Sequence, residues 1–189
     1  YEDLVGKRVC TGTTSAEGHT ICEALIASYG IDVENDMETY WMEQDEGMTR
    51  LQDGDLDGVY LNAGAPIAAF TNVIVAGPGA YTLVTPNQEN LEKVVEQFPS
   101  LTITTIPAGT YSGIDFDVPA LRTAISVCTP VDTPAAVTYE LAKYTYENWA
   151  DIQTTHASLL ETEPADLAES PIPLHPGAAA FFREVGVIE

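Results

Sequence analysis

Short apolar strands alternate with amphipathic helices along most of this chain, and this alternation restricts its fold more than any other feature. Residues 7–12 have the composition of a strand, and residues 18–29 carry apolar side chains at helical spacing before Gly30, a residue typical of the position after a helix. The same order continues with a strand at 37–42, a helix at 45–52 and a strand at 58–61. The pattern predicts an α/β sheet.

The second half of the chain gives further strand and helix signals. We expect a β-rich run around residues 73–75, strands at 81–84, 101–106 and 120–128, and a long helix from residue 133, whose apolar face we expect to pack in the core. Asn87 has the right chemistry to cap a helix, and Pro176 and Gly186 suit the start and end of a closing helix. A Gly/Asp/Pro connector at 112–119 predicts two parts, residues 1–116 and 117–189.

Composition excludes several classes of protein. Seven basic and 29 acidic residues give a net charge of −22, so a phosphate-binding surface for nucleic acid is not expected, and a salt-adapted source is favoured. The chain has no apolar run of 18 residues, and its opening residues, with neither initiator Met nor signal-peptide regions, favour a processed or trimmed product. The three cysteines lack metal or redox spacing, and we expect packed thiols, with one disulfide as the alternative.

No metal or cofactor site is predicted from the spacing of the charged residues. The histidines, at 19, 156 and 175, lie far apart in sequence. The run Asp53-x-Asp55-x-Asp57-Gly58 begins like a calcium loop, but Gly64 stands where the bidentate glutamate is needed. We therefore interpret this run as an acidic turn.

The loop between the first strand and the first helix is the first candidate site. It comprises Gly12, Thr13, Thr14 and Ser15, and His19 follows in the helix. Ligands of α/β sheets collect at the carboxyl ends of strands, where helix N–H groups attract carboxylate or phosphate oxygens. The alternative is that Thr13, Thr14 or Ser15 merely caps the helix, and the sequence leaves both open.

A second loop follows the carboxyl end of the strand at 58–61, and it contains Asn62, Ala63, Gly64 and Pro66. Gly64 allows a ligand to approach the backbone, and Asn62 both donates and accepts hydrogen bonds. The alternative is a tight turn in which Asn62 bonds to its own backbone. Tyr111 is expected either to cover the ligand with its ring or to be an ordinary packed tyrosine.

Several motifs resemble the TAXI branch of the TRAP-transporter solute receptors. The most specific are the closing segment Ile-Pro-Leu-His-Pro-Gly-Ala at 172–178 and Thr-Ile-Pro-Ala-Gly-Thr-Tyr at 105–111, and further likenesses lie at 3–9, 52–58, 62–66, 96–99 and 117–119. The family's glycine-rich loop is altered here at 11–18, where only Gly12 is kept. The family is also longer, so the resemblance implies a C-terminal portion of such a receptor.

The resemblance implies a periplasmic-binding-protein-like (type II) three-layer α/β sandwich, with residues 1–116 as the second lobe and 117–189 as the returning part of the first. It implies an extracytoplasmic receptor, without cofactor or enzyme activity, that captures a small organic anion or amino acid such as glutamate or 2-oxoglutarate for a TRAP membrane permease. Two alternatives stay open: a small α/β hydrolase or transferase using Ser15 and His19, and a regulatory domain that senses a small acid.

Overall fold

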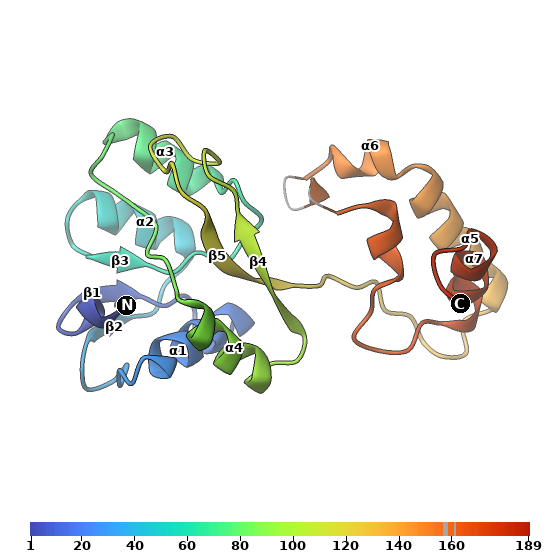
Figure 1. The fold of residues 1–189 in the computed structure, drawn as a ribbon, viewed down its shortest axis with the longest axis horizontal. Coiled ribbons are helices and arrows are strands. Elements are labelled where there is room, and N and C mark those ends of the chain that lie inside the picture. The colour runs from blue at the N-terminus through green and yellow to red at the C-terminus, as the bar shows by residue number, and fades with distance from the viewer. Residues whose placement is uncertain (157–158, 161) are drawn as a thin grey trace. The chain divides into compact units, whose positions relative to one another are not determined.

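The computed structural model describes residues 1–156, 159–160 and 162–189, which form two compact units, Tyr1–Arg122 (unit 1) and Thr123–Glu189 (unit 2). The predicted division lay at residue 116. Unit 1 contains the turn η1 (Glu2–Leu4) and then, in order, β1 (Arg8–Cys10), α1 (Glu17–Ser28), β2 (Glu38–Tyr40), α2 (Gln44–Gln52), β3 (Gly58–Val59), α3 (Ala68–Ala76), α4 (Gln88–Gln97), β4 (Leu101–Ile106) and β5 (Val118–Thr123), as Figure 1 shows.

Unit 1 is an α/β domain with a small parallel sheet and a separate pair of strands. The parallel sheet has the order β2-β1-β3, and β4 pairs with β5 in a hairpin. Val9 packs against α1, whereas the neighbouring Cys10 lies 3.2 Å from the point where a Cβ on Gly47 of α2 would stand. Because successive strand residues point to opposite faces, α1 and α2 cover opposite faces of the parallel sheet.

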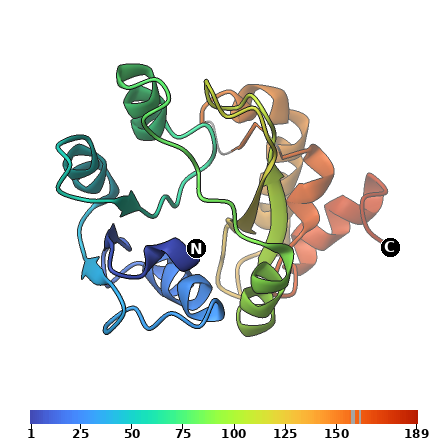
Figure 2. The same cartoon turned by 60° about the vertical axis from the view of Figure 1, so that its left-hand side comes forward.

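The local signals that start and end helices act as predicted at three places. Gly30 and Gly186 have φ of 79° and 75° just past the ends of α1 and α7 (Pro176–Glu184), a region that other residues rarely adopt. Asn87 caps α4 by accepting the Asn90 N–H at 2.9 Å. The apolar face of α4 packs against that of α1, and Figure 2 shows the two helices side by side.

Three sequence predictions are wrong in their secondary structure. The β-rich run at 73–75 lies in helix α3, because Phe70, Val73 and Ile74 bury one helical face and this packing outweighs the strand preference of branched residues. Residues 81–84 form no strand. The strand predicted at 120–128 begins at Val118 and ends at Thr123, since residues beyond it have no neighbouring strand among the described residues.

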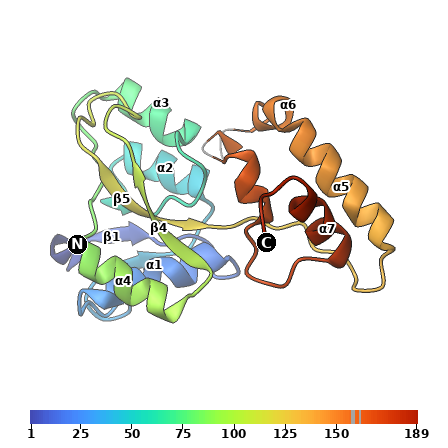
Figure 3. The same cartoon turned by 45° about the vertical axis from the view of Figure 1, so that its right-hand side comes forward.

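Unit 2 is helical, with α5 (Ala135–Glu147), α6 (Trp149–Gln153), the turn η3 (Pro164–Ala168) and α7. Helices α5 and α7 pack closely, as Figure 3 shows. Gly177 makes this possible, because a Cβ there would clash with the Ala135 carbonyl oxygen and the Thr138 hydroxyl. His175 caps α7 through its Nδ1, which accepts the Gly177 N–H at 3.3 Å and lies 2.7 Å from Thr138 Oγ1.

Unit 2 exposes more apolar surface than the sequence predicts. The α5 residues expected in the core, Val137, Leu141 and Tyr144, are each at least half exposed. Cys10 and Cys22 are buried free thiols, as expected, but Cys128 is exposed, so the prediction of three packed thiols is wrong for that residue. Among the described residues, no helix combines the length and the apolar character that crossing a membrane requires.

Candidate functional site

The two predicted loops lie beside each other at one edge of the parallel sheet. Since β1 and β3 are parallel neighbours, the loops that follow them leave from the same edge. Asn62, from the β3 loop, packs on Gly18 in the first turn of α1. A Cβ on Gly18 would stand only 3.0 Å from Asn62 Cγ and would clash with the side-chain amide nitrogen. Only glycine at residue 18 allows this close approach.

The loop after β1 does not cap the helix with a side chain. Helix α1 has Ala16 as its N-cap, and none of Thr13, Thr14 and Ser15 makes a side-chain capping bond, so the capping alternative is wrong. Gly12 adopts φ of 92°, which explains why the chain needs glycine there. The hydroxyls of Thr13, Thr14 and Ser15 therefore make no capping bond at this edge of the sheet, whereas the His19 N–H is bonded to the Ala16 carbonyl oxygen at 3.1 Å.

His19 is buried among partners other than Ser15. Its Nδ1 lies 3.2 Å from Thr11 Oγ1 and its Nε2 lies 3.3 Å from Glu23 Oε1. Both ring nitrogens are thus engaged, and the hydrogen bond between Ser15 and His19 that a hydrolase requires is not formed in this structure. His19 instead fixes the start of α1 against the end of β1.

The loop after β3 is anchored by a residue of α2 rather than by a hydrogen bond within the loop. The Asn62 N–H donates to Gln44 Oε1 at 2.9 Å, and in the described part of the chain the Asn62 side chain makes no hydrogen bond to its own backbone, so the self-bonded turn considered for Asn62 does not form. The side chains of Asn62, Ala63 and Pro66 are exposed, and Gly64 is half-buried. The loop thus presents a backbone and an amide that are open to a ligand.

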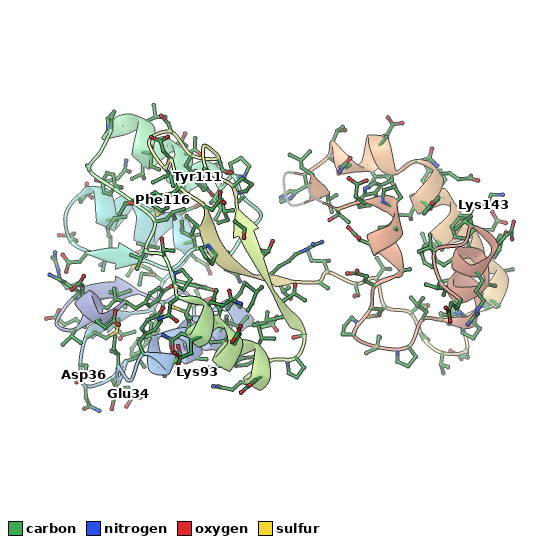
Figure 4. The ribbon with its side chains drawn as sticks, in the orientation of Figure 1. Glu34, Asp36, Lys93, Tyr111, Phe116 and Lys143 are labelled. Carbon is green, nitrogen blue, oxygen red and sulfur yellow. The ribbon has the colours of Figure 1, made fainter. Side chains whose placement is uncertain are left out.

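Tyr111 has a structural role in the described state. Its hydroxyl accepts the Ile67 N–H at 2.9 Å, and its ring meets Phe70 edge to face at 4.9 Å between centroids. With 2% of its surface exposed, the side chain belongs to the core next to α3, where Figure 4 labels it. Tyr111 therefore positions the segment that follows the β3 loop.

A partly enclosed cavity of about 440 Å³ lies inside unit 1, between the parallel sheet and the hairpin. Of the predicted site residues, Asn62, Ala63 and Tyr111 line it, whereas Gly12, Thr13, Thr14, Ser15, His19, Gly64 and Pro66 do not. The lining that sequence analysis missed is mostly apolar and comes from both the parallel sheet and the hairpin; it includes Val59, Tyr60, Leu61, Ile106, Val118, Ala120 and Leu121. No periodic pattern marks these residues, because the cavity depends on how far the hairpin stands from the parallel sheet.

The site has little positive charge. Arg8 binds Asp57 in a two-point ion pair, with 2.9 Å between Nη2 and Oδ1, and this pair holds the pKa of the Asp57 carboxyl well below its usual range. Arg50 and Lys93 likewise pair with acidic residues on their own helices. No lysine or arginine lines the cavity, and Figure 4 shows Lys93 far from Tyr111.

Unit 1 has the α/β architecture of a parallel sheet covered by helices, a class in which ligands commonly bind outside the carboxyl ends of the strands. The sequence comparison agrees with that class: a model of the NMT1-like family matches residues 1–186. The chain therefore belongs to the NMT1-like family. This membership indicates a solute-binding-protein-like domain, in a family whose members are generally binding proteins rather than enzymes.

Proposed function

We propose that this chain is part of an extracytoplasmic receptor that captures a small organic anion or amino acid and delivers it to a TRAP-type membrane permease. The observation that carries the proposal is the contact between Gly18 and Asn62, because it brings two strand-terminal loops together at one sheet edge. Family membership supports the same class of protein. We base the glutamate or 2-oxoglutarate type of solute, the TRAP partner and the location on the resemblance that the motifs at 105–111 and 172–178 carry to the TAXI receptors.

In this proposal the loops bind without covalent chemistry. Loop N–H groups, the hydroxyls of Thr13, Thr14 and Ser15, and the Asn62 amide hold a carboxylate, since no free arginine stands at this edge among the described residues. Gly64 lets the solute approach the backbone.

We further propose that unit 1 is one lobe of a type II binding-protein fold and that residues 117–189 belong largely to the other. Ile125 and Val127 are 84% and 85% exposed in the irregular segment after β5, and Val131, which is 89% exposed, lies in the turn that follows. Residues 118–131 contain no acidic side chain, although the chain has 29. A run of exposed apolar side chains of this kind is normally covered by another part of a protein.

Isothermal titration in concentrated salt tests the binding proposal, with glutamate, 2-oxoglutarate and neutral amino acids as solutes. We expect one of these solutes to bind and Asn62→Ala to weaken it at least tenfold, since one good polar contact contributes about 1.4 kcal/mol. The matched control is Asn35→Ala, an exposed asparagine near Glu34 and Asp36, which Figure 4 labels. Equal losses in both variants, or no binding of any solute, would refute the proposal.

Delivery to a permease has its own test. Proteoliposomes that contain a TRAP membrane subunit are expected to take up the bound solute only when the receptor is added, and Asn62→Ala is expected to reduce the rate at low solute concentration. Receptor-independent uptake would contradict the assigned partner.

A further inference from the structure

Two unpaired strand edges face the same cavity in unit 1. Strand β3 is paired with β1 on one side, and β5 is paired with β4 on one side. Both strands contribute to the cavity lining, with Gly58 and Val59 on one wall and Val118 to Leu121 on the other. The space between the sheet and the hairpin is therefore a slot within one lobe, and it is separate from Thr13, Thr14 and Ser15, which do not border it.

The walls of this slot are apolar and carry almost no charge. Leu25, Ile26, Phe70 and Leu91 border it from three helices, and the one charged lining residue, Asp57, is neutralised by Arg8. An ionised guest would lose its hydration here and find no free charge of opposite sign, which is unfavourable. Its volume of about 440 Å³ lies in the range of cavities that hold drug-sized molecules.

The slot offers a few hydrogen-bonding groups along these apolar walls. Tyr60 lines it, and burial raises the pKa of the Tyr60 phenol, so this group stays protonated and able to donate. Thr82 adds a hydroxyl. Such a small number of polar groups in an apolar wall is typical of sites that orient an uncharged ligand.

We propose that this slot binds an uncharged, largely apolar small molecule, in addition to the solute held by the loops. The guest fills the volume between β3 and β5 and removes the apolar walls from water. The inference does not depend on the proposed transport function, because it rests on the interior of unit 1 alone.

Fluorescence titration of the full chain with N-phenyl-1-naphthylamine, an uncharged apolar probe, tests this proposal. Wild-type protein is expected to bind the probe saturably, and Ala120→Leu, which adds three carbons to the wall of the slot, is expected to weaken binding at least tenfold. The control is Ala27→Leu on the exposed face of α1, where affinity is expected to stay within twofold. Ala65→Leu, also in the lining, provides a second cavity-filling variant.

Further controls separate this site from other sites on the chain. Ile125→Ser removes an exposed apolar residue of unit 2 and is expected to leave probe affinity unchanged, as is Ser15→Ala in the loop. Loss of probe binding in Ile125→Ser would place the probe on unit 2 and overturn the proposal. A chain that binds the probe but none of the titrated solutes would refute the transport proposal alone.

The same variants report whether the slot exists in solution. If β3 and β5 closed onto each other, there would be no room for added carbons, and both Ala120→Leu and Ala65→Leu would lower the melting temperature by more than about 10 °C. That outcome, or an affinity in both variants equal to wild type, would refute the proposal. We expect the melting temperature of at least one of them to stay level or rise, since filling a void stabilises a core.

Discussion

Replacing Gly177 by alanine should destabilise the packing of α5 against α7, although alanine is the better helix former. The new methyl would stand 2.8 Å from the Ala135 carbonyl carbon and would clash with its oxygen and with the Thr138 hydroxyl. A side-chain movement cannot relieve this clash, because the methyl group meets the backbone of α5. The helices must separate, and overpacking of this kind costs about 1–3 kcal/mol.

Two further terms set the size of the effect. Separation of the helices weakens the contact between His175 Nδ1 and Thr138 Oγ1, which at 2.7 Å contributes about 1 kcal/mol. Higher helix propensity returns at most about 1 kcal/mol. The sum is a loss of about 2 kcal/mol, which for a unit of this size lowers the melting temperature by roughly 8–16 °C.

Hydrogen exchange of the full chain, read on the amides of α5 and α7, measures this loss, with thermal unfolding as the second readout. Ala180→Gly is the matched control, because Ala180 is an exposed residue of the same helix. Propensity alone predicts that Gly177→Ala stabilises and Ala180→Gly destabilises, whereas packing predicts that both destabilise and that Gly177→Ala does more harm. Unchanged or slower exchange in Gly177→Ala would refute the packing argument.

Three other substitutions in unit 1 have separate readouts. Gly18→Ala displaces the Asn62 amide, so we expect at least tenfold weaker solute binding by titration with a change in melting temperature of only a few degrees; unaltered affinity would contradict the role of that contact. Asp57→Asn removes the ion pair with Arg8. The pKa of Asp57 is lower in the folded protein than in the unfolded chain, so the ion pair stabilises the fold fully above roughly pH 4, and this stabilisation is lost as the pH falls through the native pKa. The melting temperatures of Asp57→Asn and wild type should therefore differ at pH 7 and converge toward pH 2. A difference that does not change with pH would disprove this. Tyr111→Phe leaves a backbone N–H without its acceptor and should cost about 1–2 kcal/mol by denaturant titration, while an unchanged midpoint would show that water replaces the hydroxyl.

The sequence predicted those parts of the fold that depend on local chemistry. The parallel strands β1, β2 and β3 and the helices between them lie where periodicity placed them, because each element has its own apolar face and its own end signal. The bounds of β4 were predicted without error from its Thr/Ile alternation. Helix α3 was missed, because only its burial against Tyr111 and Met48 selects helix over strand for a run of branched residues.

The candidate site was predictable only in part, for a similar reason. Strand-terminal position identified Asn62 and the loop from Gly12 to Ser15, and the structure brings the Asn62 side chain onto Gly18. The slot could not be predicted, because it is formed by the separation of the parallel sheet from the hairpin, and the residues of both look like ordinary core. A lining residue such as Ala120 has no sequence feature that distinguishes it from a packed alanine.

Charge explains why the loops and the slot are suited to different guests. In a chain with a net charge of −22, most fixed positive charge in unit 1 is already paired, as Arg8 is with Asp57. We therefore propose that an anion is held by helix N–H groups and hydroxyls at the edge formed by the loop before α1. The slot has few hydrogen-bond donors, so it favours a ligand that is weakly hydrated in water, such as an uncharged apolar molecule. In these two proposals, the polar loop edge of unit 1 therefore binds an anion and the apolar slot binds an uncharged molecule.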